Sequence, residues 1–205
     1  MELGIGMFGD MAFDFQTQKY QSAGNRLKEI IEEVKLADEL GIDSFAMGEH
    51  HREDYAVAAP EIMLAALASV TKNIKLSSGV NVISSADPVK LFQDFTTIDL
   101  MSNGRAELMA GRGSFIESFP VFGYNLDDYN ELFAEKLDLL LQLRANETLT
   151  WKGEFRAPIN NLTLYPRPER ELPISIAVGG TPASVHRAAT LGLPIVFAII
   201  GGNPA

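Results

Sequence analysis

Two kinds of segment alternate along the whole chain. Short apolar runs bounded by Gly, Pro, Asn or Asp predict strands, and longer segments with apolar residues three and four positions apart predict helices. The predicted strands are residues 3–8, 43–47, 74–83, 105–110, 174–178 and 195–199. The predicted helices are residues 25–40, 60–70, 88–101, 127–143 and 182–191. Strands that are apolar on both faces and alternate with helices indicate a parallel sheet covered by helices.

The predicted helices have recognisable start and stop signals. Pro60 and Pro88 lie in first turns, Asp87 and Thr181 are N-cap candidates, and Gly41 follows the first helix. Proline has the φ angle of a first turn, and Asp or Thr can accept hydrogen bonds from the free N–H groups there. Each predicted strand is therefore followed by a loop and then by a helix.

About six strand–helix units are predicted, fewer than the eight of a closed barrel. The sequence therefore predicts an α/β fold, a TIM (β/α)8 barrel that is incomplete, and residues 1–205 are expected to form one domain. The missing units predict either a fragment of a longer barrel or an open barrel covered by a neighbour. Residues 146–172 are expected to be an irregular excursion between the fourth helix and the fifth strand, either a lid or a surface hairpin.

Composition and charge exclude several classes of protein. The chain is 46% hydrophobic and 21% charged, as in ordinary globular proteins. Its formal net charge of -10 disfavours nucleic acid and anionic membrane surfaces as partners. It contains no cysteine, so disulfides and thiolate nucleophiles are absent. The apolar run 193–200 is too short to span a bilayer and predicts a buried strand, and the N-terminus has no signal-peptide pattern, so a cytoplasmic protein is expected.

Gly4, Gly6 and Gly9 spell the pattern G-x-G-x-x-G. A dinucleotide-binding fingerprint places these glycines between a strand and a helix that follows it directly. Here they lie within the predicted strand 3–8, and no helix begins before about Asn25. A dinucleotide-binding fold is therefore the less favoured interpretation.

Gly48, Glu49, His50 and His51 directly follow the second predicted strand. In a barrel of this kind, the carboxyl ends of the strands form the active-site rim. Imidazole exchanges protons near neutral pH, so His50 is predicted to transfer a proton or to make a hydrogen bond, whereas His51 is equally well explained as a solvated loop residue. A metal site is not expected, because consecutive side chains diverge and the third imidazole, His186, lies on a helix that should cover the outside.

Two glycine-containing loops predict an anion-binding site at the same rim. Gly111 and Gly113 flank Arg112 after the fourth strand, where a guanidinium can hold a phosphate; the alternative is an ion pair with Glu117. After the fifth strand, a second loop offers free N–H groups and hydroxyls at a helix start. The residues of that loop are Gly179, Gly180, Thr181, Pro182 and Ser184.

The predicted helix 88–101 has more apolar surface than packing against one sheet requires. An interface with a second subunit would cover the excess, because exposed apolar patches mark interaction sites. We therefore expect a homodimer formed through this helix and the helix 60–70.

Five segments together resemble the bacterial luciferase-like flavin monooxygenases. They are residues 48–51, 84–89, 102–108, 111–113 and 192–194. None is specific by itself, but their order and their positions at strand ends and helix boundaries extend the resemblance over the whole chain. One departure is the pair Gly179 and Gly180, where bacterial luciferase has a Glu-Ser pair.

The resemblance implies a TIM barrel that binds FMN at its carboxyl-end rim, receives reduced FMN from a separate reductase and uses O2 on a small organic substrate. It places the family's catalytic histidine at His50. The implied cofactor-binding residues are Gly79, Val80, Gly111, Arg112, Gly179, Gly180, Thr181 and Ser184. It also implies a cis peptide bond between Gly79 and Val80. Two alternatives stay open: a flavin-binding or pairing protein without turnover, and an enzyme that uses the deazaflavin F420 for hydride transfer.

Overall fold

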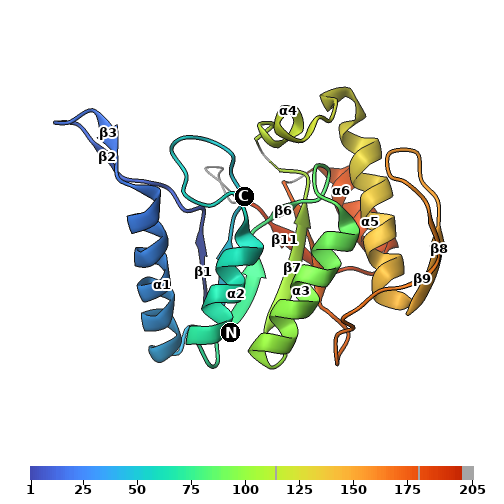
Figure 1. The fold of residues 1–205 in the computed structure, drawn as a ribbon, viewed down its shortest axis with the longest axis horizontal. Coiled ribbons are helices and arrows are strands. Elements are labelled where there is room, and N and C mark those ends of the chain that lie inside the picture. Colours follow the sequence, from blue (N-terminus) through green and yellow to red (C-terminus); the bar gives the residue numbers. More distant parts are fainter. Residues whose placement is uncertain (114, 180, 200–205) are drawn as a thin grey trace.

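The computed structural model describes residues 1–113, 115–179 and 181–199, and its centre is a curled parallel sheet of 7 strands. Six strands follow one another across the sheet in the order β1 (Gly4–Met7), β4 (Ser44–Met47), β5 (Lys75–Ser78), β7 (Ala106–Gly111), β10 (Ile174–Val178) and β11 (Ile195–Phe197). In the described residues β1 pairs only with β4 and β11 only with β10, so the sheet is open (Figure 1). The prediction of an incomplete barrel is confirmed.

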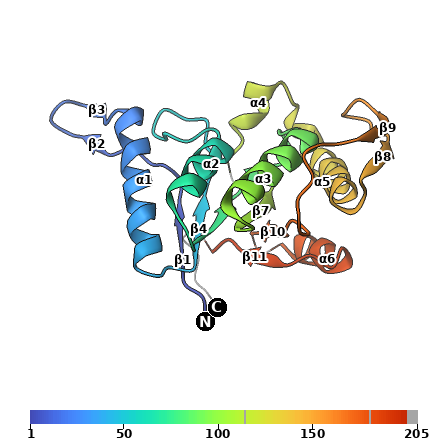
Figure 2. The same cartoon turned by 60° about the horizontal axis from the view of Figure 1, so that its bottom comes forward.

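Helices cover the outside of this half-barrel. Figure 2 shows a row of helices beside the sheet: α1 (Ala23–Glu39), α2 (Pro60–Val70), α3 (Pro88–Ser102) and α5 (Tyr129–Ala145). The helix α6 (Pro182–Thr190) contacts β10. All five predicted helices are present, with ends shifted by at most a few residues.

Polar side chains define the starts of several helices. The Asp87 carboxylate accepts hydrogen bonds from the N–H groups of Val89 and Lys90, at 2.9 and 3.1 Å. Ser22 caps α1 by accepting from Asn25 N–H at 3.2 Å. Thr181 occupies the N-cap position of α6 but makes no side-chain cap bond there. Its hydroxyl is therefore available for a different contact, described below.

The third predicted strand, 74–83, is divided in two. The strand β5 ends at Ser78, and within the described part of the chain the short β6 (Asn81–Val82) pairs with β7 only. Between them the peptide bond from Gly79 to Val80 is cis, as the resemblance implies. The division places Val80 at the carboxyl end of the sheet, where the strands end in loops.

The core lies between the sheet and the row of helices. Phe45, Leu76 and Leu108 from the strands are 0% exposed and belong to one buried cluster with Phe92 and Phe95 of α3, which are also 0% exposed. Burial of each such side chain contributes about 1.5–3 kcal/mol. This packing holds the strand ends in fixed positions, and the loops that follow them depend on it.

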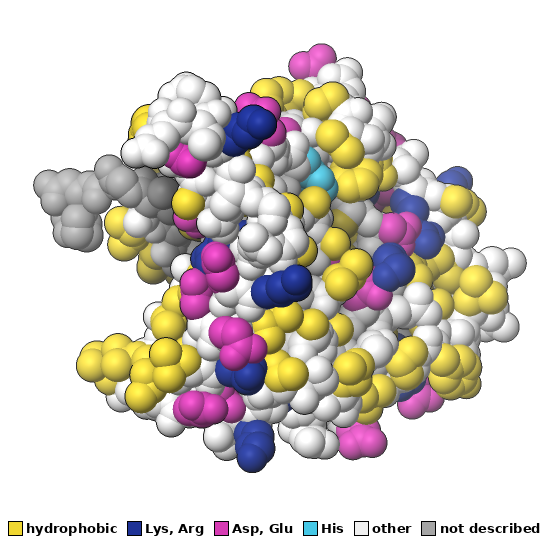
Figure 3. Space-filling model, turned by 60° about the vertical axis from the view of Figure 1, so that its left-hand side comes forward, with side chains coloured by type: hydrophobic (Ala, Val, Ile, Leu, Met, Phe, Trp, Pro, Cys, Tyr) yellow, Lys and Arg dark blue, Asp and Glu magenta, His cyan; other side chains and the backbone are white. Residues whose placement is uncertain are grey.

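The strand β11 corrects one prediction. The run 193–200 predicts a buried strand, but Val196, Phe197 and Ile199 are 37%, 58% and 61% exposed. The reason is its place at the edge of the sheet, where it is paired on one side only within the described part of the chain. Hydrophobic side chains lie among acidic and basic ones on the surface seen in Figure 3. No helix among the described residues has the length and apolarity needed to cross a membrane.

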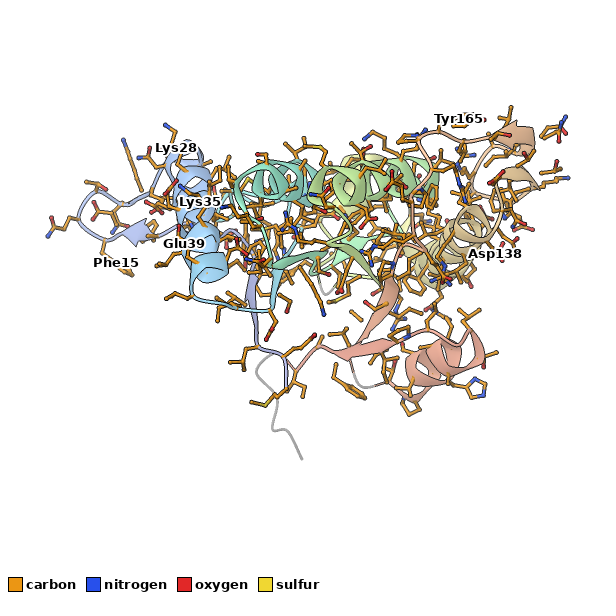
Figure 4. The ribbon with its side chains drawn as sticks, turned by 90° about the horizontal axis from the view of Figure 1, so that it is seen from below. Phe15, Lys28, Lys35, Glu39, Asp138 and Tyr165 are labelled. Carbon is orange, nitrogen blue, oxygen red and sulfur yellow. The ribbon has the colours of Figure 1, made fainter. Side chains whose placement is uncertain are left out.

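The excursion 146–172 is a surface hairpin. Its strands β8 (Thr148–Trp151) and β9 (Ile159–Thr163) are antiparallel and pack beside α5. Trp151 Nε1 donates to the Asp138 carboxylate at 2.9 Å, and Glu135 accepts the N–H of Glu154 at 2.6 Å. In Figure 4, Asp138 and Tyr165 lie at one end of the molecule and Phe15 at the other.

Three short elements are absent from the predicted pattern. They are the hairpin of β2 (Phe13–Asp14) and β3 (Lys19–Tyr20), the helix α4 (Ser118–Phe122) and the 3-10 turn at Leu126–Asp128. Segments of two to five residues are shorter than the window in which hydrophobic periodicity can be recognised.

Candidate functional site

A cavity of about 600 Å³ opens at the carboxyl ends of the strands. The loops after β4 and β7 supply most of its polar lining, and residues of β11 and the segment after it supply an apolar wall. No described residue of the excursion 146–172 lines it. The excursion is therefore not a lid of this cavity, and the two loops at the rim determine its chemistry.

His50 is held on several sides. Its side chain is 8% exposed, and its Nδ1 lies 3.2 Å from Oε1 of Glu117. Its ring stacks on Tyr55 with centroids 4.2 Å apart and meets Phe115 edge-on at 4.8 Å. An ionised carboxylate only accepts hydrogen bonds, so this contact requires a proton on Nδ1. The nitrogen Nε2 has no protein partner within the described residues, so its chemistry allows it to exchange a proton with a bound molecule.

His51 is a packed side chain rather than a solvated one. Its side chain is 11% exposed, its Nε2 lies 3.0 Å from Oε1 of Glu49, and its ring meets Phe122 edge-on at 5.2 Å. The other carboxylate oxygen of Glu49 accepts the backbone N–H of Val82 at 2.9 Å. His50 and His51 thus have separate carboxylate partners.

Arg112 lies at the rim of the cavity without an acidic partner. Its Nη1 donates to Asn130 at 3.0 Å and its Nη2 donates to Ser184 Oγ at 3.0 Å. Within residues 1–113, 115–179 and 181–199 it forms no ion pair, so the alternative pairing with Glu117 is wrong: that carboxylate contacts His50. A guanidinium without a carboxylate partner can bind an anionic ligand.

The second predicted loop meets Arg112 at the start of α6. Ser184 is 7% exposed, and its hydroxyl also lies 2.7 Å from the Thr181 hydroxyl. Gly179 lines the cavity, and a Cβ added to it would meet nothing within 4 Å. Gly180, also predicted to bind the cofactor, lies outside the described residues. The structure thus brings Arg112 and Ser184 together, although 72 residues separate them in sequence.

Two glycines allow Val80 to reach the cavity. A Cβ on Gly111 would lie 2.5 Å from Val80 Cγ2, and a Cβ on Gly79 would lie 2.9 Å from Ala46 Cβ. Real Cβ atoms do not approach other atoms so closely, so larger residues at either position would displace the segment. Gly79, Val80 and Gly111 all line the cavity.

Several lining residues have no signal in the sequence. Tyr55, Phe115 and Ser118 lie in loops or short elements, and the Ser118 hydroxyl is buried with no partner in the described structure. Glu117 enters the sequence interpretation only as an alternative partner for Arg112. No group of three His, Asp or Glu side chains able to hold a metal ion is found among the described residues.

Comparisons with known proteins give the family. The family model described as luciferase-like monooxygenase matches residues 7–205. The N-acetyl-S-alkylcysteine monooxygenase of Bacillus subtilis is 29% identical over 182 residues, which are 87% of this chain and 52% of the relative. The F420-dependent glucose-6-phosphate dehydrogenase of Amycolatopsis mediterranei is 29% identical over 75% of this chain and 48% of its own.

Solved structures agree with the fold. The monooxygenase RslO1 from Streptomyces bottropensis superposes with a TM-score of 0.85 at 29% identity, over 95% of this chain and 59% of that one. The chain spans about half the length of the curated relatives it matches. Since the family model matches nearly every residue and the half-barrel has the same fold as these enzymes, the chain belongs to the luciferase-like monooxygenase family.

Proposed function

We propose that the chain carries the flavin site of an FMN-dependent oxidoreductase, a monooxygenase that uses O2 on a small organic substrate. The observation that carries the proposal is the Arg112 guanidinium, which lies beside Ser184 at the cavity rim with no carboxylate partner in the described residues. In a chain with a net charge of -10, an anion needs such local donors. Arg112 supplies the charge, and Ser184 and Thr181 supply hydroxyls.

The remaining lining also fits FMN. The phosphate would lie against Arg112, Thr181 and Ser184 at the start of α6. Gly79 and Val80, which line the same cavity, would hold the ring system. A cavity of about 600 Å³ is within the range that small-molecule ligands occupy.

Different residues of the chain would then have different roles. When bound in its reduced form, FMN supplies electrons for the activation of oxygen. Arg112 and Ser184 bind and orient the phosphate. His50, with Nδ1 directed to Glu117, holds or moves a proton at Nε2, and Phe115 and Tyr55 exclude water from its ring. Reduced FMN is expected to come from a separate reductase.

F420 is the second candidate cofactor. The relative from Amycolatopsis mediterranei is named as F420-dependent and is as similar to this chain as the monooxygenase from Bacillus subtilis. F420 would use the same surface at Gly79 and Val80, and His50 for proton transfer, in a hydride-transfer reaction. A flavin-binding protein without turnover is the third interpretation, and the buried contact between His50 and Glu117 argues against it.

A homodimer is part of the proposal. A groove of about 670 Å³ runs beside α2 and α3, and Ile62 and Met101 on these helices are 72% and 50% exposed. A second copy that packs its own α2 and α3 here would bury this surface. Glu49 lines both the groove and the cavity, so the proposed interface adjoins the site.

The test measures cofactor binding directly. FMN and F420 are titrated separately against the protein, and the cofactor's own fluorescence is followed. Arg112→Ala should weaken FMN binding by about 10- to 150-fold, which corresponds to the loss of about 1.5–3 kcal/mol for a hydrogen bond to a charged group. Arg144 lies on α5 and forms an ion pair with Glu171, away from the cavity lining, so Arg144→Ala serves as the control. Equal FMN affinity in Arg112→Ala and the parent would contradict the proposed phosphate site.

A further inference from the structure

Residues 79–82, the segment at which the third strand is divided, form the floor of the cavity. On the side that faces β4, this floor segment has no strand partner within the described residues. Pairing between β4 and β5 ends at Met47 and Ser78, and the last backbone bond there runs from Gly79 N–H to Met47 O at 2.6 Å. Beyond it, β6 pairs only with β7 among the residues that the structure describes. The N–H of Val82 therefore has no strand on the β4 side to accept its hydrogen bond.

Glu49 takes the place of that strand. It follows β4 by two residues, and its Oε2 accepts the Val82 N–H at 2.9 Å. Its side chain is 8% exposed, and its Oε1 is engaged by His51 at 3.0 Å. Both oxygens are thus used within the protein. A carboxylate occupied in this way is suited to holding the loop and the floor together, and not to binding substrate.

A second carboxylate supports the same segment from the helix side. Glu61 of α2 accepts a hydrogen bond from the Asn81 side chain, which is 0% exposed. Burial, and after it the nearby charge of Glu49, raises the pKa of Glu61. Asn81 and Val82 are therefore fixed on this side by two acidic side chains instead of a backbone ladder. Glu49 is the one of the two that belongs to the histidine-bearing loop, where it contacts His51.

We propose that Glu49 is a positioning residue, which sets the floor segment 79–82 at a fixed height against the loop that carries His50 and His51. The inference rests on the proposed function, because the floor matters only if a cofactor lies on it. Loss of the carboxylate frees the Val82 N–H, and the segment with the Gly79–Val80 peptide then moves relative to His50. Cofactor binding weakens although the residues proposed to bind the cofactor are unchanged.

The test compares Glu49→Ala with Glu49→Gln. Gln keeps an oxygen for the Val82 N–H and an amide for His51, whereas Ala keeps neither. The exposed Glu53 of the same loop supplies the control pair, Glu53→Ala and Glu53→Gln. The first readout is backbone amide exchange of residues 79–83, measured by mass spectrometry without cofactor. The second is the FMN dissociation constant, together with the visible circular dichroism of bound FMN.

Glu49→Ala should speed exchange of residues 79–83 about tenfold or more and weaken FMN binding to a similar extent. Glu49→Gln should stay within about threefold of the parent in both, and the Glu53 variants should match the parent. Unchanged exchange in Glu49→Ala, or equal effects of Ala and Gln, would overturn the inference. If the parent itself fails to bind FMN, the proposed function fails, but the exchange measurement still decides whether Glu49 holds the segment.

Discussion

Lys136 on α5 offers a stability prediction whose size follows from the structure. Its side chain is 2% exposed, and its Nζ donates to the backbone oxygen of Ser84 at 2.7 Å. Burial lowers the pKa of Lys136 from 10.5 to about 8. The folded state therefore disfavours the charged form, and the unfolded chain binds the proton more tightly. Stability contributed by this residue is lowest below pH 8 and rises as the pH increases toward 10.5.

The shift corresponds to about 3.4 kcal/mol, at 1.36 kcal/mol for each of about 2.5 pH units. About 2 kcal/mol of this should develop between pH 7 and pH 9.5, where most tyrosines stay neutral. The centroid of the Tyr124 ring lies 3.8 Å from Nζ, and the face of the ring favours the cation and opposes part of this effect.

The assay is urea unfolding of the parent and of Lys136→Met at a series of pH values. Met fills similar space and does not titrate, so the difference between the two unfolding free energies isolates the lysine. That difference should move by about 2 kcal/mol in favour of the parent as the pH rises from 7 to 9.5. Lys28→Met, on the exposed face of α1 (Figure 4), is the matched control and should show no such trend. A pH-independent difference for Lys136→Met would refute the reasoning.

Three further predictions concern the site and the interface. His50→Ala should keep FMN affinity and lower turnover by roughly 100-fold, measured as oxygen consumption with a reductase, and His51→Ala should lower turnover less. Full activity of His50→Ala would show that His50 has no catalytic role. Gly111→Ala should lower the free energy of unfolding by about 1–3 kcal/mol and weaken FMN binding, because the new Cβ would meet Val80 at 2.5 Å. Ile62→Glu should convert a dimer into a monomer in light scattering, whereas a monomeric parent would end the dimer proposal.

The fold was predictable because its signals are local and repeated. Hydrophobic periodicity, first-turn prolines and the cap at Asp87 place every major strand and helix, and strand-end geometry predicts that Arg112 and Ser184 share a rim. The short elements were not predicted because two to five residues are too few to show a hydrophobic periodicity. The exposure of β11 was not predicted because the burial of a strand depends on which neighbour covers it, and an apolar run does not contain that information.

The polar contacts of the site were less predictable. Glu117 lies 67 residues from His50, and nothing near either residue distinguishes this pairing from the alternative pairing with Arg112. The bond from Glu49 to Val82 exists only because the third strand is interrupted, and a continuous strand was predicted there. Partners that depend on backbone irregularities are determined by the assembled structure, so sequence patterns do not reveal them.

Trp151 has a practical consequence for anyone who follows this protein by optical methods. It is the chain's single tryptophan, it is fixed to Asp138 on the outer surface of α5, and no described residue of its hairpin lines the cavity. Its emission therefore reports on the docking of the hairpin against α5. A change on adding a ligand would signal energy transfer over a distance or movement of the hairpin, and direct contact would have to be read from the ligand's own spectrum.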